Sequence, residues 1–95
     1  MKPQAIIVEI LGTFFFLSII LSAVAESSYG PIAIAAGLLA AIYFGGKISG
    51  GHYNPAVSIM MLFKGNISFP TAIAYIAAQI MGGLLALLVN SYLIL

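Results

Sequence analysis

Residues 49–58 read SGGHYNPAVS and form the least hydrophobic stretch of a chain that otherwise suits a membrane interior. The stretch holds the only histidine of the sequence, together with a glycine pair, an asparagine and a proline. The apolar residues NPAVSIMMLF at 54–63 would cover only about 15 Å as a helix, roughly half of a ~30 Å hydrocarbon core. Asn54 is a preferred N-cap and Pro55 fits a first helical turn. The stretch therefore predicts a re-entrant half-helix.

The segment before this half-helix, GKISGGHY at 46–53, is expected to be an extended arm that leads into the membrane. Loop and half-helix together are expected at about 47–64. Non-helical backbone at membrane depth is tolerated only where protein buries it or water wets it. The arm therefore implies a cavity or a pore.

The composition of the whole chain also indicates a membrane protein. Hydrophobic residues make up 63% of the sequence and charged residues 5%, and the mean hydropathy is +1.21, far outside the range of soluble domains. Three apolar segments at about 4–25, 29–46 and 69–95 are long enough for transmembrane helices. The residues ESSYGP at 26–31 have the composition of a turn. We expect an all-α, multi-pass integral membrane protein.

A signal peptide is the alternative for the first segment, because Lys2, an apolar core and the residues SAVA imitate its three regions. The apolar run is longer than usual for a signal peptide, contains Glu9 and is followed by further membrane segments. These features favour a transmembrane helix.

Small residues recur every fourth position in the second and third spans, which predicts two faces where a neighbouring helix backbone can approach closely. These positions are Ala33, Gly37, Ala41 and Gly45 in the second span, and Ala74, Ala78, Gly82, Ala86 and Asn90 in the third.

The three lysines indicate an orientation. If the amino terminus is cytoplasmic, then Lys2, Lys47 and Lys64 all lie on the cytoplasmic side, as the positive-inside rule expects. Residues 26–30 then lie outside. We expect a cytoplasmic amino terminus.

Several function classes are excluded by residue content. The chain has no cysteine and one histidine, so no metal cluster is expected, and no cofactor is implied. A net charge of +1 without a basic run gives no footprint for nucleic acid. Glu9, His52 and scattered hydroxyls show no triad or metal-ligand spacing, so we expect no enzyme.

The loop suits hydrogen bonding to a small neutral molecule. A half-helix that starts inside the membrane points its unpaired N–H groups and its positive dipole end beyond Asn54, and this end repels cations. The Asn54 amide can donate towards a lumen while its oxygen caps the half-helix. Gly50 and Gly51 allow the arm to turn and expose successive carbonyls. Such a lining disfavours ions that must shed their hydration.

The residues ISGGHYNPAVS closely resemble the first signature loop of the aquaporins, the major intrinsic protein family. EILGTFF at 9–15 looks like the family's first-helix pattern, and AYIAAQIMGG at 74–83 looks like its third-helix pattern. The resemblance covers essentially all of residues 1–95 as a single repeat with three transmembrane helices and one re-entrant half-helix. It implies a passive channel, or half of one, for water or small neutral solutes such as glycerol.

The resemblance also implies roles for residues of the loop and its supports. Asn54, Pro55 and Ala56 would be the signature, and the carbonyls of Gly50, Gly51, His52 and Tyr53 the pore-lining ladder. Glu9 would be the buried carboxylate that braces the loop, although a charge near the helix start could also snorkel. Gln79 could face the pore, but an interhelical hydrogen bond to loop backbone is the commoner use of such a group. His52 could be a pH switch or a ligand, although a loop residue held by its ring nitrogens is favoured.

The sequence departs from the family pattern in its filter and its length. Family members have six spans and two half-helices, whereas this chain supplies one repeat. The family's filter uses an arginine directly after the second signature, and this chain has no arginine; Val57 occupies the equivalent place after its own signature. Ile34 matches a filter position that often carries an aromatic residue. A homo-oligomer, or a partner carrying the second half-repeat, would be needed in the membrane. The alternative function is a non-conducting assembly module or fragment that retains the half-fold.

Overall fold

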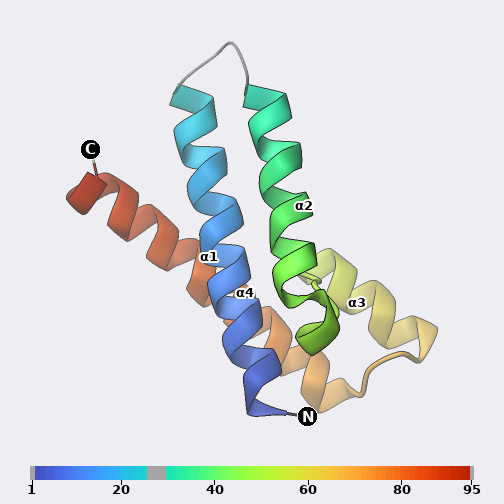
Figure 1. The fold of residues 1–95 in the computed structure, drawn as a ribbon. Coiled ribbons are helices and arrows are strands. Elements are labelled where there is room, and N and C mark those ends of the chain that lie inside the picture. Colours follow the sequence, from blue (N-terminus) through green and yellow to red (C-terminus); the bar gives the residue numbers. More distant parts are fainter. Residues whose placement is uncertain (1, 26–29, 95) are drawn as a thin grey trace.

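The structure is a computed structural model that describes residues 2–25 and 30–94. These residues are almost entirely helical and include no strand, which confirms the expected all-α fold class. In chain order the elements are α1 (Pro3–Ala25), α2 (Gly30–Ser49), α3 (Pro55–Lys64), α4 (Phe69–Val89) and a π-helical turn, η1 (Asn90–Ile94) (Figure 1). Most of the turn expected at 26–31 lies outside the described residues.

Three of the helices are long and apolar enough to cross a bilayer: Pro3–Val24, Gly30–Ser49 and Phe69–Tyr92. The large hydrophobic side chains on their outer faces are exposed, including Phe44 at 89% and Leu84 at 63%. Such surfaces are unfavourable in water and favourable against lipid tails or another apolar helix. The chain is an integral membrane protein.

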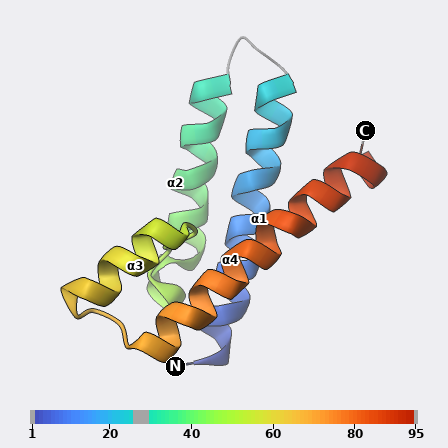
Figure 2. The same ribbon diagram turned by 180° about the vertical axis from the view of Figure 1, so that it is seen from behind.

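Helix α1 lies at the centre of the arrangement. It packs against α2 on one side and α4 on the other, whereas the backbones of α2 and α4 do not approach each other. Figure 1 shows α1 and α2 side by side and antiparallel, and Figure 2 shows α4 crossing α1 obliquely on the opposite face.

The small residues of α2 and α4 lie at these contacts, as their spacing predicts. A Cβ on Gly37 would come within 2.6 Å of the Ile19 side chain, and one on Gly82 within 2.6 Å of the Ile10 carbonyl oxygen. Helix backbones therefore approach closely because the side chains between them are missing. The buried faces include Gly37, Ala41 and Gly45 on α2, and Ala78, Gly82 and Ala86 on α4.

Helix α3 is re-entrant in its path. The chain leaves α2 at the end of the molecule that also holds the amino terminus, turns back to mid-height, and follows α3 down to the same end, where α4 begins (Figures 1 and 2). With ten residues, α3 is about 15 Å long, half of a hydrocarbon core. It packs against α4.

Two boundaries differ from those expected from the sequence. Helix α2 continues to Ser49 instead of ending near residue 46, so Lys47 belongs to its last turn and the arm begins only at Gly50. The helix continues past the glycine pair because its last turn has partners: the Ser49 hydroxyl donates to Glu9, and the Ser49 carbonyl accepts from the Tyr75 hydroxyl. The third span ends its α-helix at Val89 and then widens into η1. There the Asn90 side chain donates to the hydroxyl of Ser18 at 3.1 Å.

Candidate functional site

The arm between α2 and α3 has an unusual backbone. The φ angles of Gly50, Gly51 and Tyr53 are 93°, 64° and 52°. Glycine adopts this left-handed region without strain, whereas a tyrosine persists there only if its surroundings hold it, at a cost on the order of 1–3 kcal/mol. The strained residue therefore points to contacts that fix the arm.

All four amides of the arm, from Gly50 to Tyr53, donate towards the protein. The first two bond to the end of α2: Gly50 N–H to the Gly46 carbonyl at 2.9 Å, and Gly51 N–H to the Ser49 hydroxyl at 3.1 Å. The amides of His52 and Tyr53 donate to the two carboxylate oxygens of one side chain, Glu9 on α1, at 3.1 and 2.9 Å. The arm therefore leaves no backbone donor unpaired.

Glu9 is completely buried, and its carboxylate accepts four hydrogen bonds. Besides the two arm amides it accepts from the hydroxyl of Ser49 at 2.6 Å and from Nε2 of Gln79 at 2.9 Å. Four donors match the acceptor capacity of a carboxylate, which a buried charge requires. The side chain lies inside the bundle, between α1, α4 and the arm.

Gln79 lies on the buried face of α4. The sequence favoured a hydrogen bond from this residue to the loop backbone, but in the structure its partners are side chains. Its Nε2 group donates to Glu9 and to the Ser58 hydroxyl on α3, both at 2.9 Å. The amides of His52 and Tyr53 are already paired with Glu9, and Gln79 reaches the loop through that carboxylate. Its Oε1 atom and the hydroxyl of Thr13 are buried without a partner among the described residues.

The carbonyls of Gly50, Gly51, His52 and Tyr53 receive no hydrogen bond from any described residue. Gly50 is exposed and Gly51 half-buried. All four amides of the arm are thus paired, whereas its four successive carbonyls form a row of acceptors that have no partner among the described residues. A row of backbone carbonyls can replace part of the hydration of a molecule that donates hydrogen bonds.

Asn54 ends this row with a donor. Its backbone is extended, and its Oδ1 atom accepts from the Ala56 amide at 2.8 Å, which caps α3. Asn54 is exposed, and its Nδ2 group donates to none of the described residues. Pro55 stands at the first position of α3, where its missing N–H costs nothing.

The Tyr53 ring fills the space between α1 and α2. It lies where a Cβ on Gly12 or Gly45 would be, and its hydroxyl donates to the Ala41 carbonyl at 2.7 Å. The side chain is 3% exposed. The packing of this ring between α1 and α2, together with the hydrogen bond from the Tyr53 amide to Glu9, holds Tyr53 at its positive φ angle.

His52 is held between α3 and α4. Its Nδ1 atom lies 2.8 Å from the Ser58 hydroxyl, and its ring meets that of Tyr75 edge to face at a centroid distance of 5.0 Å. The Tyr75 hydroxyl donates to the carbonyl of Ser49 at 2.6 Å. One ring nitrogen of His52 is thus fixed by a side chain, and α4 is tied to the end of α2.

Sequence reasoning missed Ser49, Ser58 and Tyr75. Each gave a weak signal: Ser49 precedes a glycine pair, Ser58 follows Asn54 by one helical turn, and Tyr75 precedes Gln79 by one turn and shares its face. Hydroxyl groups are common in membrane helices, so these spacings alone did not separate them from packing residues.

The filter-like residues Ile34 and Val57 are half-buried and lie on α2 and α3, two helices whose backbones do not approach each other. The structure therefore does not bring them together. Within residues 2–25 and 30–94, no three His, Cys, Asp or Glu side chains form a group that could hold a metal ion.

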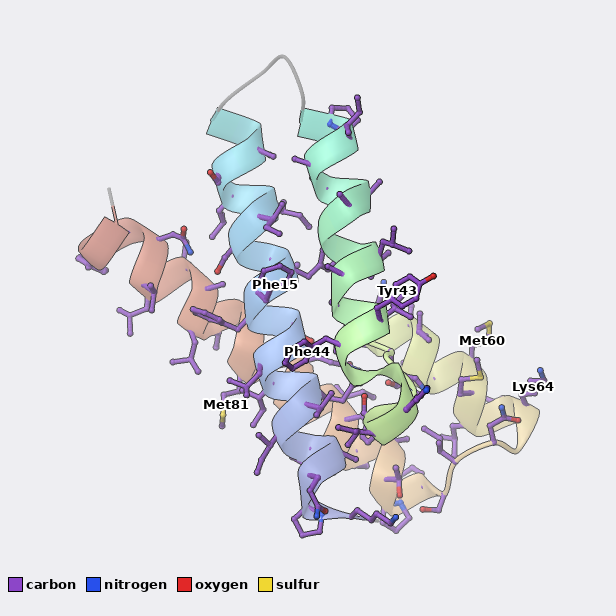
Figure 3. All side chains as sticks on the ribbon, viewed as in Figure 1. Phe15, Tyr43, Phe44, Met60, Lys64 and Met81 are labelled. Carbon is purple, nitrogen blue, oxygen red and sulfur yellow. The ribbon has the colours of Figure 1, made fainter. Side chains whose placement is uncertain are left out.

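A separate cavity of about 360 Å³ lies between α1 and α2. Its lining is apolar and includes Phe15 and Phe44, which Figure 3 shows on the same face of the helix pair. The Tyr53 hydroxyl on its wall is already paired with Ala41. A polar solute would find no free hydrogen-bonding group there, so the arm, and not this cavity, is the candidate site.

Three apolar helices long enough to cross a membrane, together with a short re-entrant helix that begins after the cap Asn54, define the fold class as a multi-pass membrane protein with a re-entrant segment. The family model of the major intrinsic proteins matches residues 1–94, and the chain belongs to this family. Similar proteins include "Glycerol uptake facilitator protein-like 6" of Lactiplantibacillus plantarum, which is 45% identical over 83 residues, 82% of this chain and 38% of the relative.

Two further relatives show the breadth of the similarity. "Aquaporin Z" of Photorhabdus laumondii is 38% identical over 88 residues, 82% of this chain and 38% of its own length. "Lens fiber major intrinsic protein" of Gallus gallus is 35% identical over 88 residues, 85% of this chain and 34% of its own length. The chain thus spans little more than a third of the relatives that it matches.

Proposed function

We propose that this chain forms one half of a passive membrane channel for water or small neutral solutes such as glycerol. The observation that carries the proposal is the one-sided arm, whose amides all donate inward while its four carbonyls remain free. The names of the relatives, a glycerol uptake facilitator protein and an aquaporin, support this class of solute.

Passage needs no covalent chemistry in this proposal. A water molecule or a hydroxyl group donates to the carbonyls in turn and accepts from the Nδ2 group of Asn54. The amino-terminal end of α3 carries a partial positive charge beside Asn54, which disfavours a cation at that point. The chain acts as a channel wall and not as an enzyme.

We propose that Glu9 and Gln79 are bracing residues, because their contacts hold the arm from behind. Ile34 and Val57 are proposed as apolar counterparts of filter positions. Neither carries a charge, so an assembled pore would lack an arginine from this chain.

A complete pore needs a second wall, and relatives of this chain are much longer. We propose that the wall comes from a second copy or from a partner that carries the other half-repeat. We also propose that the amino terminus is cytoplasmic. Lys47 and Lys64 lie in the last turns of α2 and α3, at the same end of the molecule as the amino terminus (Figures 1 and 3).

Liposome swelling tests the proposal. Liposomes should hold equal amounts of folded wild type, Asn54→Asp or Asn54→Ala at densities that permit oligomers. Asp caps a helix as well as Asn, so Asn54→Asp should keep the loop but replace the donor with a negative charge, which lowers solute flux and raises proton leak. Asn54→Ala should lose the cap, at about 1 kcal/mol, without adding charge.

Two outcomes would contradict the proposal in different ways. Wild type that swells no faster than empty liposomes would mean that the chain does not conduct by itself, and would favour the assembly module. Equal flux and equal proton leak for wild type and Asn54→Asp would mean that a pore exists but that Asn54 does not line it.

A further inference from the structure

The Ser58 hydroxyl is a buried junction between α3, α4 and the arm. The residue is 0% exposed, and its Oγ atom has two side-chain neighbours: Nε2 of Gln79 at 2.9 Å and Nδ1 of His52 at 2.8 Å. A hydroxyl has one hydrogen to donate and can accept two. Whether each neighbouring atom donates or accepts a hydrogen bond therefore decides where the Ser58 hydrogen points.

The Gln79 neighbour can only be a donor. The same nitrogen lies 2.9 Å from Oε1 of Glu9, and a carboxylate in a site with four donors accepts and does not donate. Turning the amide over would place two oxygens against each other. Glu9 thus fixes the orientation of the Gln79 amide, and the amide uses one acceptor position of Ser58.

The hydrogen of Ser58 then has one acceptor among the described residues, Nδ1 of His52. The Ser58 hydroxyl makes no hydrogen bond to a backbone carbonyl of the described residues. If Nδ1 carried a proton, the buried Ser58 hydrogen would lose its partner, which costs roughly 1–3 kcal/mol. The contacts thus favour an unprotonated Nδ1.

We propose that Glu9, Gln79 and Ser58 form a relay that sets the tautomer of His52, with the ring proton on Nε2, and that this N–H is a second hydrogen-bond donor of the solute path. Nε2 lies 3.3 Å from the position of a Cβ on Gly50, the first free carbonyl residue of the arm. Nε2 has no hydrogen-bond partner among the described residues. The fully buried polar side-chain atoms without a partner there are Thr13 Oγ1 and Gln79 Oε1, so Nε2 retains some solvent-accessible surface. The donor role rests on the proposed channel function, whereas the tautomer does not.

Nitrogen NMR of the full chain in detergent or bilayers tests the tautomer directly. The chain has a single histidine, so ¹⁵N-histidine labelling gives one imidazole spin system. A protonated ring nitrogen resonates well upfield of an unprotonated one, and couplings to the two ring carbon-bound protons tell Nε2 from Nδ1. At a pH where the ring is neutral, we expect Nε2 to be fully protonated. A protonated Nδ1, or the mixture shown by a histidine peptide, would overturn the proposal.

Variants at Ser58 separate the relay from the intrinsic preference of imidazole. Ser58→Ala should return the ring to the tautomer mixture of the peptide, and Ser58→Thr, which keeps the hydroxyl, should restore the single tautomer. An unchanged tautomer in Ser58→Ala would show that the relay does not act. If Ser58→Ala fails to fold, the wild-type and Ser58→Thr spectra still decide between one tautomer and a mixture.

Liposome swelling then tests the donor role. Ser58→Ala should slow the flux of glycerol relative to wild type, and Ser58→Thr should recover it. Slow flux in both variants, or in neither, would contradict the donor role. If wild type itself does not conduct, the channel proposal fails while the NMR result for the tautomer stands.

Discussion

The amide of Tyr53 donates to Oε1 of Glu9 at 2.9 Å, although the two residues are 44 positions apart in the sequence. The amide of His52 donates to the other oxygen of the same carboxylate at 3.1 Å. One side chain on α1 therefore pairs with two successive donors of the re-entrant arm. Without it, these amides would be buried in the membrane interior with no partner.

Substitution of Glu9 should separate hydrogen bonding from packing. Glu9→Gln keeps an acceptor oxygen, whereas Glu9→Leu keeps only the bulk of the side chain. We expect the free energy of unfolding in detergent to fall more for Glu9→Leu, by roughly 1–3 kcal/mol for each donor left unpaired. Chemical denaturation monitored by circular dichroism measures the difference. Equal stability of the two variants would refute the bracing role.

The adjacent glycines 82 and 83 should respond differently to alanine. A Cβ on Gly82 would lie 2.6 Å from the backbone oxygen of Ile10, which cannot move without shifting α1. A Cβ on Gly83 would meet only the end of the Leu17 side chain, at 3.0 Å.

Both alanines gain up to about 1 kcal/mol of helix propensity. Overpacking should exceed this gain for Gly82→Ala, which we expect to lower the free energy of unfolding by about 1–3 kcal/mol. Gly83→Ala serves as the control and should be nearly neutral. Thermal unfolding in detergent compares them, and a Gly82→Ala variant at least as stable as wild type would argue against the close approach of α1 and α4.

Removal of one hydroxyl should loosen the contact between α4 and the end of α2. Tyr75→Phe loses the 2.6 Å hydrogen bond to the Ser49 carbonyl but keeps the ring that contacts His52. We expect a loss of about 1 kcal/mol and faster hydrogen exchange of the arm amides. Tyr92→Phe is the matched control, because Tyr92 is 76% exposed and its hydroxyl has no described partner. Identical exchange rates in the two variants would exclude Tyr75 as a support of the arm.

Orientation in the membrane can be tested with single cysteines, because the chain has none of its own. The lysine distribution predicts that an impermeant thiol reagent applied to sealed cells labels Ser28→Cys and spares Asn66→Cys. The reverse pattern would show an external amino terminus. Labelling of both variants would reveal insertion in two orientations.

The sequence by itself determined the local features of this protein. Mean hydropathy and segment length identify the spanning helices, because a bilayer of fixed thickness demands about twenty apolar residues for each one. Asn54 and Pro55 mark the start of α3, because an N-cap and a first-turn proline act within one turn of a helix. The four-residue spacing of small residues identified the packed faces of α2 and α4, because this spacing follows the helix period.

Only the tertiary structure decided which polar groups meet. Helix α2 ends at Ser49 and not near residue 46 because Ser49 bonds to Glu9 on α1 and to Tyr75 on α4, and no local pattern records these contacts. Gln79 could have faced loop backbone or a lumen, and its partners became definite only when α1, α3 and α4 placed Glu9 and Ser58 within 2.9 Å of its amide. Hydrogen bonds between residues that lie 21 and 70 positions apart depend on how the helices cross, and the chain's periodicity does not encode that geometry at any single position.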